Sequence, residues 1–194
     1  MQIHKLTGDK LDSALNDLAR LRSEVFRDFP YLYDGTLAYE QDYIQGLARA
    51  KDAIIAAAED EGRIVGCATG SALAGHHEEF AAPFAAHNYD PAEVFYCGES
   101  VLLPAYRGRG LGHRFFDFRE AHARECGYKY SAFCAVVRPA DHPLRPAGYV
   151  PLDAFWEKRG YAKVPGMLAN FDWKDVDQAG ETEHSMQFWL REIV

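Results

Sequence analysis

The sequence contains no long apolar run and only four widely spaced cysteines. No stretch approaches the roughly 18 consecutive apolar residues that a bilayer-crossing helix needs. The first residues, Met1-Gln2-Ile3-His4-Lys5, are not followed by the apolar core of a signal peptide. Because the cysteines form no C-x-x-C pair, we expect them to be reduced thiols. These absences predict a soluble chain that stays in the cytoplasm and needs no disulfide to fold.

Basic residues are fewer than acidic ones. The chain has 21 lysines and arginines against 29 aspartates and glutamates, which gives a formal net charge of −8. Nucleic acids and anionic membranes bind through basic patches, so neither is expected as a partner. The acidic balance suits a cationic small molecule better. With 48 % hydrophobic and 26 % charged residues, as in ordinary globular proteins, the 194 residues are expected to form a single domain, 1–194.

The order of the expected elements predicts an α/β fold. Apolar spacings of three and four residues indicate helices, and short apolar or alternating stretches between turn residues indicate strands. We expect strands at 2–6, 53–58, 63–73, 94–103, 128–137, 169–174 and 185–193, and helices at about 10–29 (capped by Asp9 and closed by Pro30), 36–47, 110–125 and 152–159, with a polar insertion at 75–91. One clear strand–helix–strand crossover predicts a mixed, mostly antiparallel sheet of six to seven strands flanked by about four helices.

A glycine-rich turn between a strand and a helix is the most informative segment. Its glycines, Gly108, Gly110 and Gly112, permit a tight turn and leave no β-carbon to block a ligand. The first amides of the following helix are free, and the helix dipole is positive there. Arg107, Arg109 and Arg114 add positive charge, so the segment predicts an anion site shaped for a diphosphate. A glycine-rich helix start without a ligand is the alternative.

Two common phosphate motifs do not fit this turn. A P-loop needs Gly-Lys followed by Ser or Thr, whereas His113 follows Gly112. A dinucleotide fingerprint needs G-x-G-x-x-G after the first strand, whereas these glycines alternate and lie past the middle of the chain.

On these residues the sequence resembles the GNAT superfamily of N-acetyltransferases. Arg107-Gly108-Arg109-Gly110-Leu111-Gly112 matches the signature Arg/Gln-x-x-Gly-x-Gly/Ala, and Leu102-x-Pro104-x-Tyr106 is similar to its usual lead-in. A second motif, Phe155-Trp156-Glu157-Lys158-Arg159-Gly160-Tyr161, resembles the family's Phe-Tyr-x-Lys-x-Gly-Phe. The expected element order agrees with the family fold over almost the whole chain.

The resemblance implies acetyl-CoA as co-substrate and no metal. Its diphosphate would lie on the turn, and the preceding strand would splay from its neighbour at a bulge and present free amides to the pantetheine arm. The cofactor-binding residues implied are Val101, Leu102, Leu103, Arg107, Gly108, Arg109, Gly110, Leu111, Gly112 and Arg114.

The implied reaction is transfer of the acetyl group to a primary amine of a small molecule, by direct attack in a ternary complex. Two alternatives remain: a catalytically silent acyl-CoA-binding sensor, and an acetyltransferase for protein N-termini or lysines. Homodimers are frequent in such families, so a homodimer is open as well.

Glu99 is the predicted general base. An alkylamine has a pKa near 10 and must lose a proton before it attacks, and Glu99 interrupts an apolar strand that leads to the cofactor turn. A glutamate on the solvent face of that strand is the alternative. Many family members use a tyrosine as general acid where this chain has Trp156, so Tyr149 and Tyr161 are the candidate acids, although a thiol can also leave unassisted.

The acceptor is expected between two loops. Phe29, Tyr31 and Tyr33 offer aromatic walls for a cationic or aromatic amine, and Arg138 could bind an acceptor carboxylate. Packing of the helix junction and capping of helix carbonyls are the structural alternatives. The run His76-His77-Glu78-Glu79 is read as a solvated loop, because adjacent side chains point in different directions and no second ligand pair has matching spacing.

Overall fold

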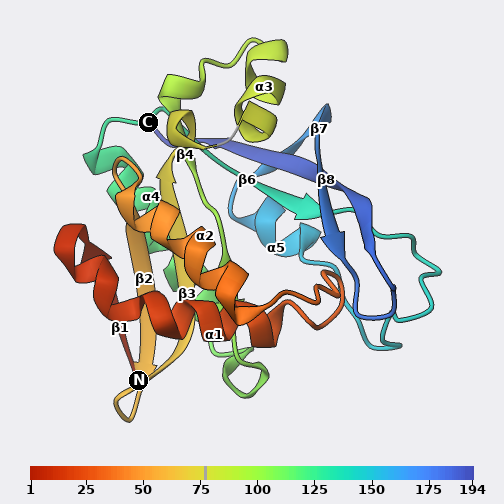
Figure 1. Cartoon of the computed structure of the whole chain (residues 1–194). Helices are drawn as coiled ribbons and strands as arrows, with labels where there is room; N and C mark the ends of the chain where they lie inside the picture. Colours follow the sequence, from red (N-terminus) through yellow and green to blue (C-terminus); the bar gives the residue numbers. More distant parts are fainter. Residues whose placement is uncertain (77) are drawn as a thin grey trace.

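The computed structural model describes residues 1–76 and 78–194, and it has a mixed sheet between helices (Figure 1). The strands are β1 (Gln2–Thr7), β2 (Ile54–Asp60), β3 (Arg63–Ala72), β4 (Val94–Tyr96), β5 (Ser100–Leu102), β6 (Tyr130–Val136), β7 (Ala162–Lys174) and β8 (Glu181–Glu192). The helices are α1 (Leu15–Val25), α2 (Leu37–Arg49), α3 (Glu78–Ala86), α4 (Leu111–Glu125) and α5 (Asp153–Lys158).

The sheet has the order β1-β2-β3-β4-β6-β8-β7, and β5 pairs with β3 beside this path. Only the β4–β6 pair is parallel among the described strand pairs. In Figure 1, α1 and α2 lie over one face of β2 and β3, and α4 lies behind the other face. The predicted α/β class and mostly antiparallel sheet are confirmed. The sheet has eight strands rather than six or seven because the segment expected at 94–103 is two strands.

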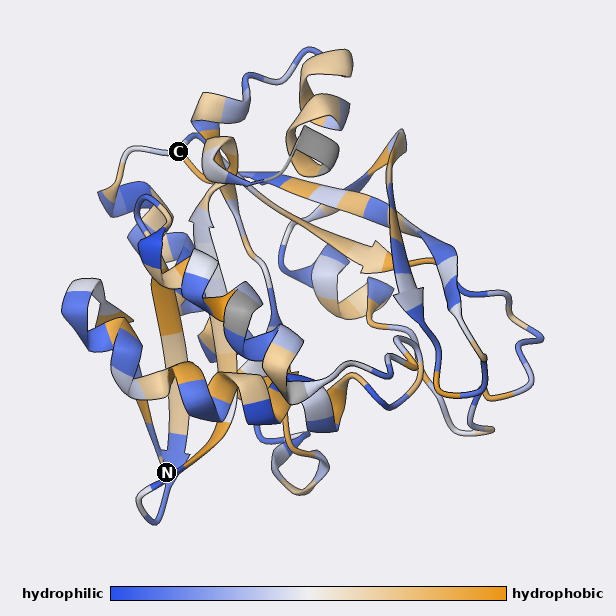
Figure 2. Cartoon of the chain, in the orientation of Figure 1, coloured by the Kyte–Doolittle hydropathy of each residue, from blue (hydrophilic) through white to orange (hydrophobic). Residues whose placement is uncertain are grey.

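The centre of the core is the β2–β3 hairpin. Helices cover both of its faces, so β2 is an unbroken apolar run, and Ile54 through Ala58 are each at most 1 % exposed. Figure 2 shows hydrophobic residues concentrated on these strands, with hydrophilic residues on the outer helix surfaces. This rigid half of the sheet carries the strand that leads to the glycine turn.

The first helical segment differs from the expectation. It begins as a 3-10 turn at Gly8–Ala14 and becomes α-helical only at Leu15, so Asp9 lies within the turn and caps no α-helix. The helix ends at Val25, well ahead of Pro30. The second helix begins where it was expected: Thr36 caps α2, and its Oγ1 accepts a hydrogen bond from the Tyr39 amide (3.3 Å).

The insertion at 75–91 contains a helix, α3, which the sequence reading missed. Two of its aromatic side chains hold it on the sheet: Phe80 packs on Phe171 (ring centroids 4.6 Å apart) and Phe84 on Phe188 (4.9 Å). The segment read as a solvated loop, His76-His77-Glu78-Glu79, therefore runs into a helix at Glu78, and His77 lies outside the described residues. Among the side chains that the structure describes, no three of His, Cys, Asp or Glu gather as a metal site. In the described part of the chain no helix is long and apolar enough to cross a membrane.

Candidate functional site

A β-bulge separates β4 from β5. On β3, Ser71 pairs with Tyr96 and Ala68 pairs with Ser100. From Ser71 to Ala68 the chain advances three residues along β3, whereas from Tyr96 to Ser100 the opposite segment advances four. The extra residue of that segment lies between β4 and β5. Such a bulge bends the strand and re-aims its side chains. This is why the segment expected as one strand is two.

The bulge is held by Thr69 on one side and by a buried arginine on the other. The Thr69 carbonyl accepts the Gly98 amide (3.2 Å), and its hydroxyl accepts the Glu99 amide (2.9 Å). Arg119, on α4, donates through Nη1 to the carbonyls of Thr69 (3.2 Å) and Glu99 (3.1 Å). Both carbonyls also accept a backbone amide across the bulge, so the guanidinium adds a second donor to each and helps to fix the Glu99 backbone.

One edge of β5 has no strand partner among the described residues. The Leu103 amide donates to the Val65 carbonyl (3.1 Å), so alternation along the strand directs the amides of Ser100 and Leu102 away from β3. The Leu102 carbonyl points the same way, and Arg107 Nε donates to it (3.2 Å). β5 therefore presents backbone donors to whatever lies beside it.

β6 diverges from β5 at the same point. The Cys97 amide still donates to the Ala132 carbonyl (2.8 Å), but beyond Ala132 the strand pairs only with β8 within the described chain. Figure 1 shows β6 leaving β4 toward β7 and β8, away from the segment that continues to α4. The splayed strands implied by the resemblance are thus present in the fold.

The glycine turn forms the start of α4. Gly108 (φ 75°) and Gly110 (φ 78°) have left-handed backbone conformations that disfavour a β-carbon. The backbone amide of Arg114 donates to the Gly110 carbonyl (3.3 Å), which is the first hydrogen bond of the helix. The amides of Gly110 to His113 therefore have no acceptor within the helix. The first turn contains no acidic residue.

The arginines around this turn keep their charges at the surface. Arg107 is half-exposed, with its nearest carboxylate, Asp28, 3.8 Å away, and Arg109 donates to the Ala105 carbonyl (3.0 Å) while remaining exposed. Arg114 is exposed and Leu111 is buried beneath the turn. Free amides, left-handed glycines and exposed guanidiniums fit a diphosphate, since all three favour a bound anion.

Glu99 lies in a buried ion cluster. Its side chain is 5 % exposed; Oε1 accepts from Arg22 Nη1 and Oε2 accepts from the Thr69 hydroxyl. Arg22, on α1, also donates through Nε to Oε2 of Glu40, a fully buried residue of α2. Burial alone would lower the pKa of Arg22, but the charges of Glu99 and Glu40 outweigh it and raise that pKa, so the guanidinium stays charged.

Tyrosine hydroxyls surround this cluster. Burial, followed by the nearby Cys134 and Glu99, raises the pKa of Tyr31. Burial, followed by a hydrogen bond to the Glu40 carboxylate, raises the pKa of Tyr33. The charge of Glu99, followed by burial, raises the pKa of Tyr43, whose ring lies 4.4 Å from the Arg22 guanidinium. These phenols therefore stay neutral at physiological pH, and two of them are predicted acceptor residues.

Arg138 fastens the predicted acceptor loop to the opposite half of the sheet. Its guanidinium forms a fork with Asp175 (2.7 Å to each oxygen) and donates to the carbonyls of Pro30 (2.8 Å) and Tyr31 (2.6 Å). Trp173 Nε1 donates to the same Tyr31 carbonyl (3.2 Å). We call this set (Arg138, Asp175, Trp173 and the loop carbonyls) the loop clasp. Because its donors are used within the protein, Arg138 positions the loop, and its contact with an acceptor stays a prediction.

The two candidate acids lie in different places. Tyr149 packs edge-on against Phe29 (4.7 Å between ring centroids), beside the acceptor loop, and burial raises its pKa. Tyr161 is 2 % exposed, and its hydroxyl pairs with Ser131 (2.8 Å) and donates to Glu120 (3.2 Å). Tyr161 is therefore a packing residue in this structure.

Trp156 packs between other aromatic rings. Its ring lies against Phe133 (5.0 Å) and Trp189 (5.1 Å) at the edge of the core. It fills space where a tyrosine would offer a proton.

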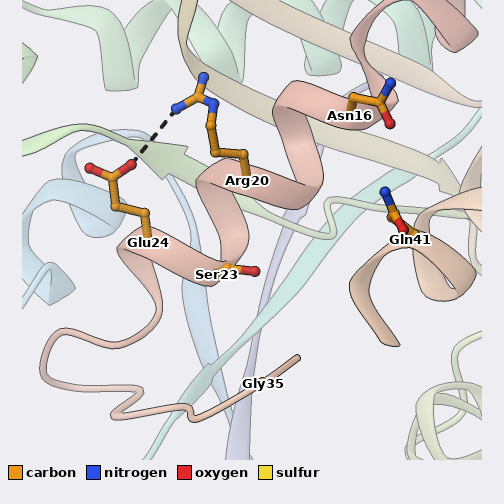
Figure 3. A pocket seen from close by; sticks show the side chains of 6 residues that line it. All are labelled: Asn16, Arg20, Ser23, Glu24, Gly35 and Gln41. Atoms are coloured by element: carbon orange, nitrogen blue, oxygen red, sulfur yellow. Dashed lines mark ion pairs between the residues drawn. The ribbon is translucent and has the colours of Figure 1, made fainter. Parts of the chain in front are cut away.

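A shallow groove lies between α1 and α2, away from the glycine turn. Asn16, Arg20, Ser23, Glu24, Gly35 and Gln41 line it, and Figure 3 shows the Arg20–Glu24 ion pair on its rim (3.7 Å). Four of these residues lie on α1 and Gln41 lies on α2, whereas Arg22, also on α1, belongs to the buried cluster around Glu99. The groove takes no part in the site described above.

Sequence reasoning missed Arg22 and Glu40. A signal was present: Arg22 interrupts the apolar face that includes Leu18, Leu21 and Val25, just as Glu99 interrupts an apolar strand. A buried cation and a buried carboxylate need each other. The sequence could therefore have suggested the Arg22–Glu99 pair, but it gave no sign that Glu40 on α2 joins them.

Comparison with known proteins agrees with this geometry. The family model described as "Acetyltransferase (GNAT) family" matches residues 16–161. No curated protein matches the chain at a significant level. Many solved structures match the chain. The three described next share its fold at low sequence identity.

Three of these structures illustrate the likeness. A ribosomal-protein-alanine N-acetyltransferase from Brucella melitensis superposes with a TM-score of 0.64 at 14 % identity, covering 99 % of both chains. An N-acetyltransferase from Staphylococcus aureus Mu50 gives 0.64 at 12 % identity and full coverage of both chains. An aminoglycoside 6'-N-acetyltransferase complexed with coenzyme A gives 0.62 at 15 % identity, covering 100 % of this chain and 98 % of the other. At these identities the likeness shows the fold.

Proposed function

We propose that this chain, which belongs to the acetyltransferase (GNAT) family, transfers an acetyl group from acetyl-CoA to a primary amine of a small molecule. The proposal depends on two neighbouring features: β5, which follows a bulge and has one unpaired edge among the described strands, and the glycine turn, whose amides are free. The turn would hold the diphosphate and the β5 edge the pantetheine arm. Acetyl-CoA supplies the acetyl thioester, and the chain's own residues orient it and handle protons.

Glu99 is the proposed general base. A carboxylate offers about four lone-pair positions. Arg22, Thr69 and Tyr43 use three of them, which leaves one for a proton. Glu99 takes one proton from the ammonium nitrogen, and the neutral nitrogen forms the new bond to the acetyl carbon as the carbon–sulfur bond breaks. The nitrogen releases its second proton in this step, which balances the proton that the leaving thiolate takes up. CoA leaves as a thiolate and takes up a proton, for which Tyr149 beside the acceptor loop is the proposed donor. An amide of β5 would polarise the thioester carbonyl, and such a donor is worth roughly 3–4 kcal/mol in comparable sites.

The loop clasp favours a small acceptor. It ties the 29–34 loop, which follows α1, to the β7–β8 side, and the Asp34 amide also donates to the Lys174 carbonyl (2.8 Å). A polypeptide crossing from one half of the sheet to the other would have to pass this tie. A free small amine needs no such path, so the small-molecule acceptor is preferred to a protein lysine or N-terminus.

The four cysteines are unpaired thiols, which fits the reducing cytoplasmic compartment predicted from the sequence.

A thiol-release assay tests the proposal. The chain is incubated with acetyl-CoA and a panel of small primary amines, and free CoA thiol is measured. We expect release that depends on at least one amine. Protection of the chain by CoA against thermal unfolding, without turnover on any amine or peptide, would instead indicate a silent binding module.

Weakening the clasp should raise the KM for the acceptor. In Arg138→Lys the planar fork is lost, because an ammonium cannot hold both Asp175 oxygens and both loop carbonyls. A misplaced loop is expected to raise the acceptor KM about tenfold or more, while the Kd for CoA stays unchanged. Arg63→Lys, an exposed arginine on β3, is the matched control. An unchanged acceptor KM in Arg138→Lys would show that the clasp does not position the acceptor.

A further inference from the structure

The buried cluster around Glu99 holds two carboxylates and one cation. Glu99 and Glu40 both pair with Arg22, and their side chains are 5 % and 0 % exposed. The second oxygen of Glu40, Oε1, is buried and pairs with no cation among the described residues, and the phenol that hydrogen-bonds to Glu40, Tyr33, is neutral. Burying an uncompensated charge is costly. The cluster therefore lacks one positive charge.

The groups that face the cluster do not supply that charge. Tyr31, Tyr33 and Tyr43 face it from the acceptor loop and from α2, and their raised pKa values keep them neutral. Thr69 faces it from β3 with a neutral hydroxyl. Aromatic rings beside a carboxylate favour a cation, because their faces are electron-rich.

The nearby cation Arg119 acts on the other face of the sheet. It belongs to α4 and reaches the backbone carbonyl of Glu99, not its carboxylate. Its charge bears on Cys97 and Tyr161, which lie among the core side chains of that face. The Glu40–Arg22–Glu99 cluster thus keeps its excess negative charge on the side of the acceptor loop.

We propose that the acceptor binds at Glu99 as a singly charged ammonium ion, and that Glu40 selects it by keeping the charge of Arg22 neutralised. Without acceptor, Arg22 is shared between two carboxylates. With acceptor, Arg22 stays on Glu40 and the ammonium pairs with Glu99, so that two cations balance two anions. The inference rests on the proposed function, and it makes Glu40 a positioning residue that acts through Arg22.

Binding of simple ammonium ions to the CoA complex tests this without turnover. Ethyl-, butyl-, hexyl- and benzylamine are titrated calorimetrically at pH 7 into the chain saturated with CoA, beside the corresponding alcohols as neutral counterparts. For the wild type we expect at least one ammonium ion to bind about tenfold or more tightly than its alcohol, the size of one charged hydrogen bond. If no ammonium ion binds, or if alcohols bind equally well, the inference is wrong.

Variants separate a charge effect from a structural one. Glu40→Gln leaves Arg22 wholly to Glu99, so the preference for the ammonium ion should fall to within about twofold, and the acceptor KM should rise about tenfold while kcat changes less than about threefold. Glu40→Asp keeps the charge and should restore most of the preference. Glu24→Gln removes a charge from the exposed face of α1, and it should leave the preference for the ammonium ion and the acceptor KM unchanged. A full preference in a folded Glu40→Gln variant contradicts the inference.

The two proposals fail in distinguishable ways. Tight, charge-selective binding of ammonium ions without thiol release from acetyl-CoA would contradict the proposed function but support the ammonium site. Thiol release with amines but no charge preference in binding would keep the function and remove the role of Glu40.

Discussion

Replacing Glu99 by glutamine should lower turnover at neutral pH by about 10²-fold or more, the usual contribution of a general base. The amide keeps the size of the side chain but cannot accept the proton that an alkylammonium must lose. Arg22 remains paired with Glu40, so the variant should still fold. Turnover is measured as thiol release at saturating acetyl-CoA and amine.

A pH series distinguishes proton removal from a structural defect. As the pH rises toward the pKa of an alkylamine, near 10, more of the amine reaches the protein already deprotonated. The ratio of wild-type to Glu99→Gln activity should therefore shrink as the pH rises, while the Kd for CoA stays equal in the two proteins. A drop of less than about threefold at neutral pH would remove Glu99 from this role.

The variant Gly112→Asp should weaken CoA binding by about 10²-fold without unfolding the chain. It places a carboxylate in the first turn of α4, where the diphosphate is proposed to lie. Two like charges about 4 Å apart repel by about 4 kcal/mol at a partly buried site, and solvent screening reduces this. The same carboxylate favours the positive end of the helix, so the melting temperature should not fall.

Gly112→Ala is the matched control for that variant. The backbone at Gly112 is not left-handed, and an added β-carbon would meet only the Phe155 ring, at 3.4 Å. Alanine should therefore change CoA affinity little. Equal losses in the alanine and aspartate variants would mean that shape, and not charge, governs this position, against a diphosphate on these amides.

The glycine turn could be predicted from sequence because its causes are local. Left-handed conformations at Gly108 and Gly110 and the free amides of a helix start follow from neighbouring residues alone. The start of α2 after Thr36 was predictable for the same reason. Glu99 could be singled out from the sequence as well, because a carboxylate within an apolar strand is unusual and suggests a functional role.

The surroundings of Glu99 could not be predicted, because they depend on tertiary packing. Its partners Arg22 on α1 and Thr69 on β3 are 77 and 30 residues away in sequence. Glu40 on α2, which shares Arg22 with it, is also far off in the sequence, and no local pattern aligns these residues. The role of Arg138 was uncertain for a similar reason, since Asp175 lies 37 residues further along the chain. Helix α3 was missed because its alanines and polar residues hid two aromatic anchors, Phe80 and Phe84.

The most direct test of the central claim compares CoA with pantetheine in calorimetric titrations of the wild-type chain. Pantetheine keeps the thiol arm but lacks the nucleotide and its diphosphate. If the amides of the α4 turn grip the diphosphate, CoA should give a single saturable site and pantetheine should bind at least about 10²-fold more weakly, as expected for the loss of charged hydrogen bonds. No heat with CoA, or equal affinity for both compounds, would contradict the account.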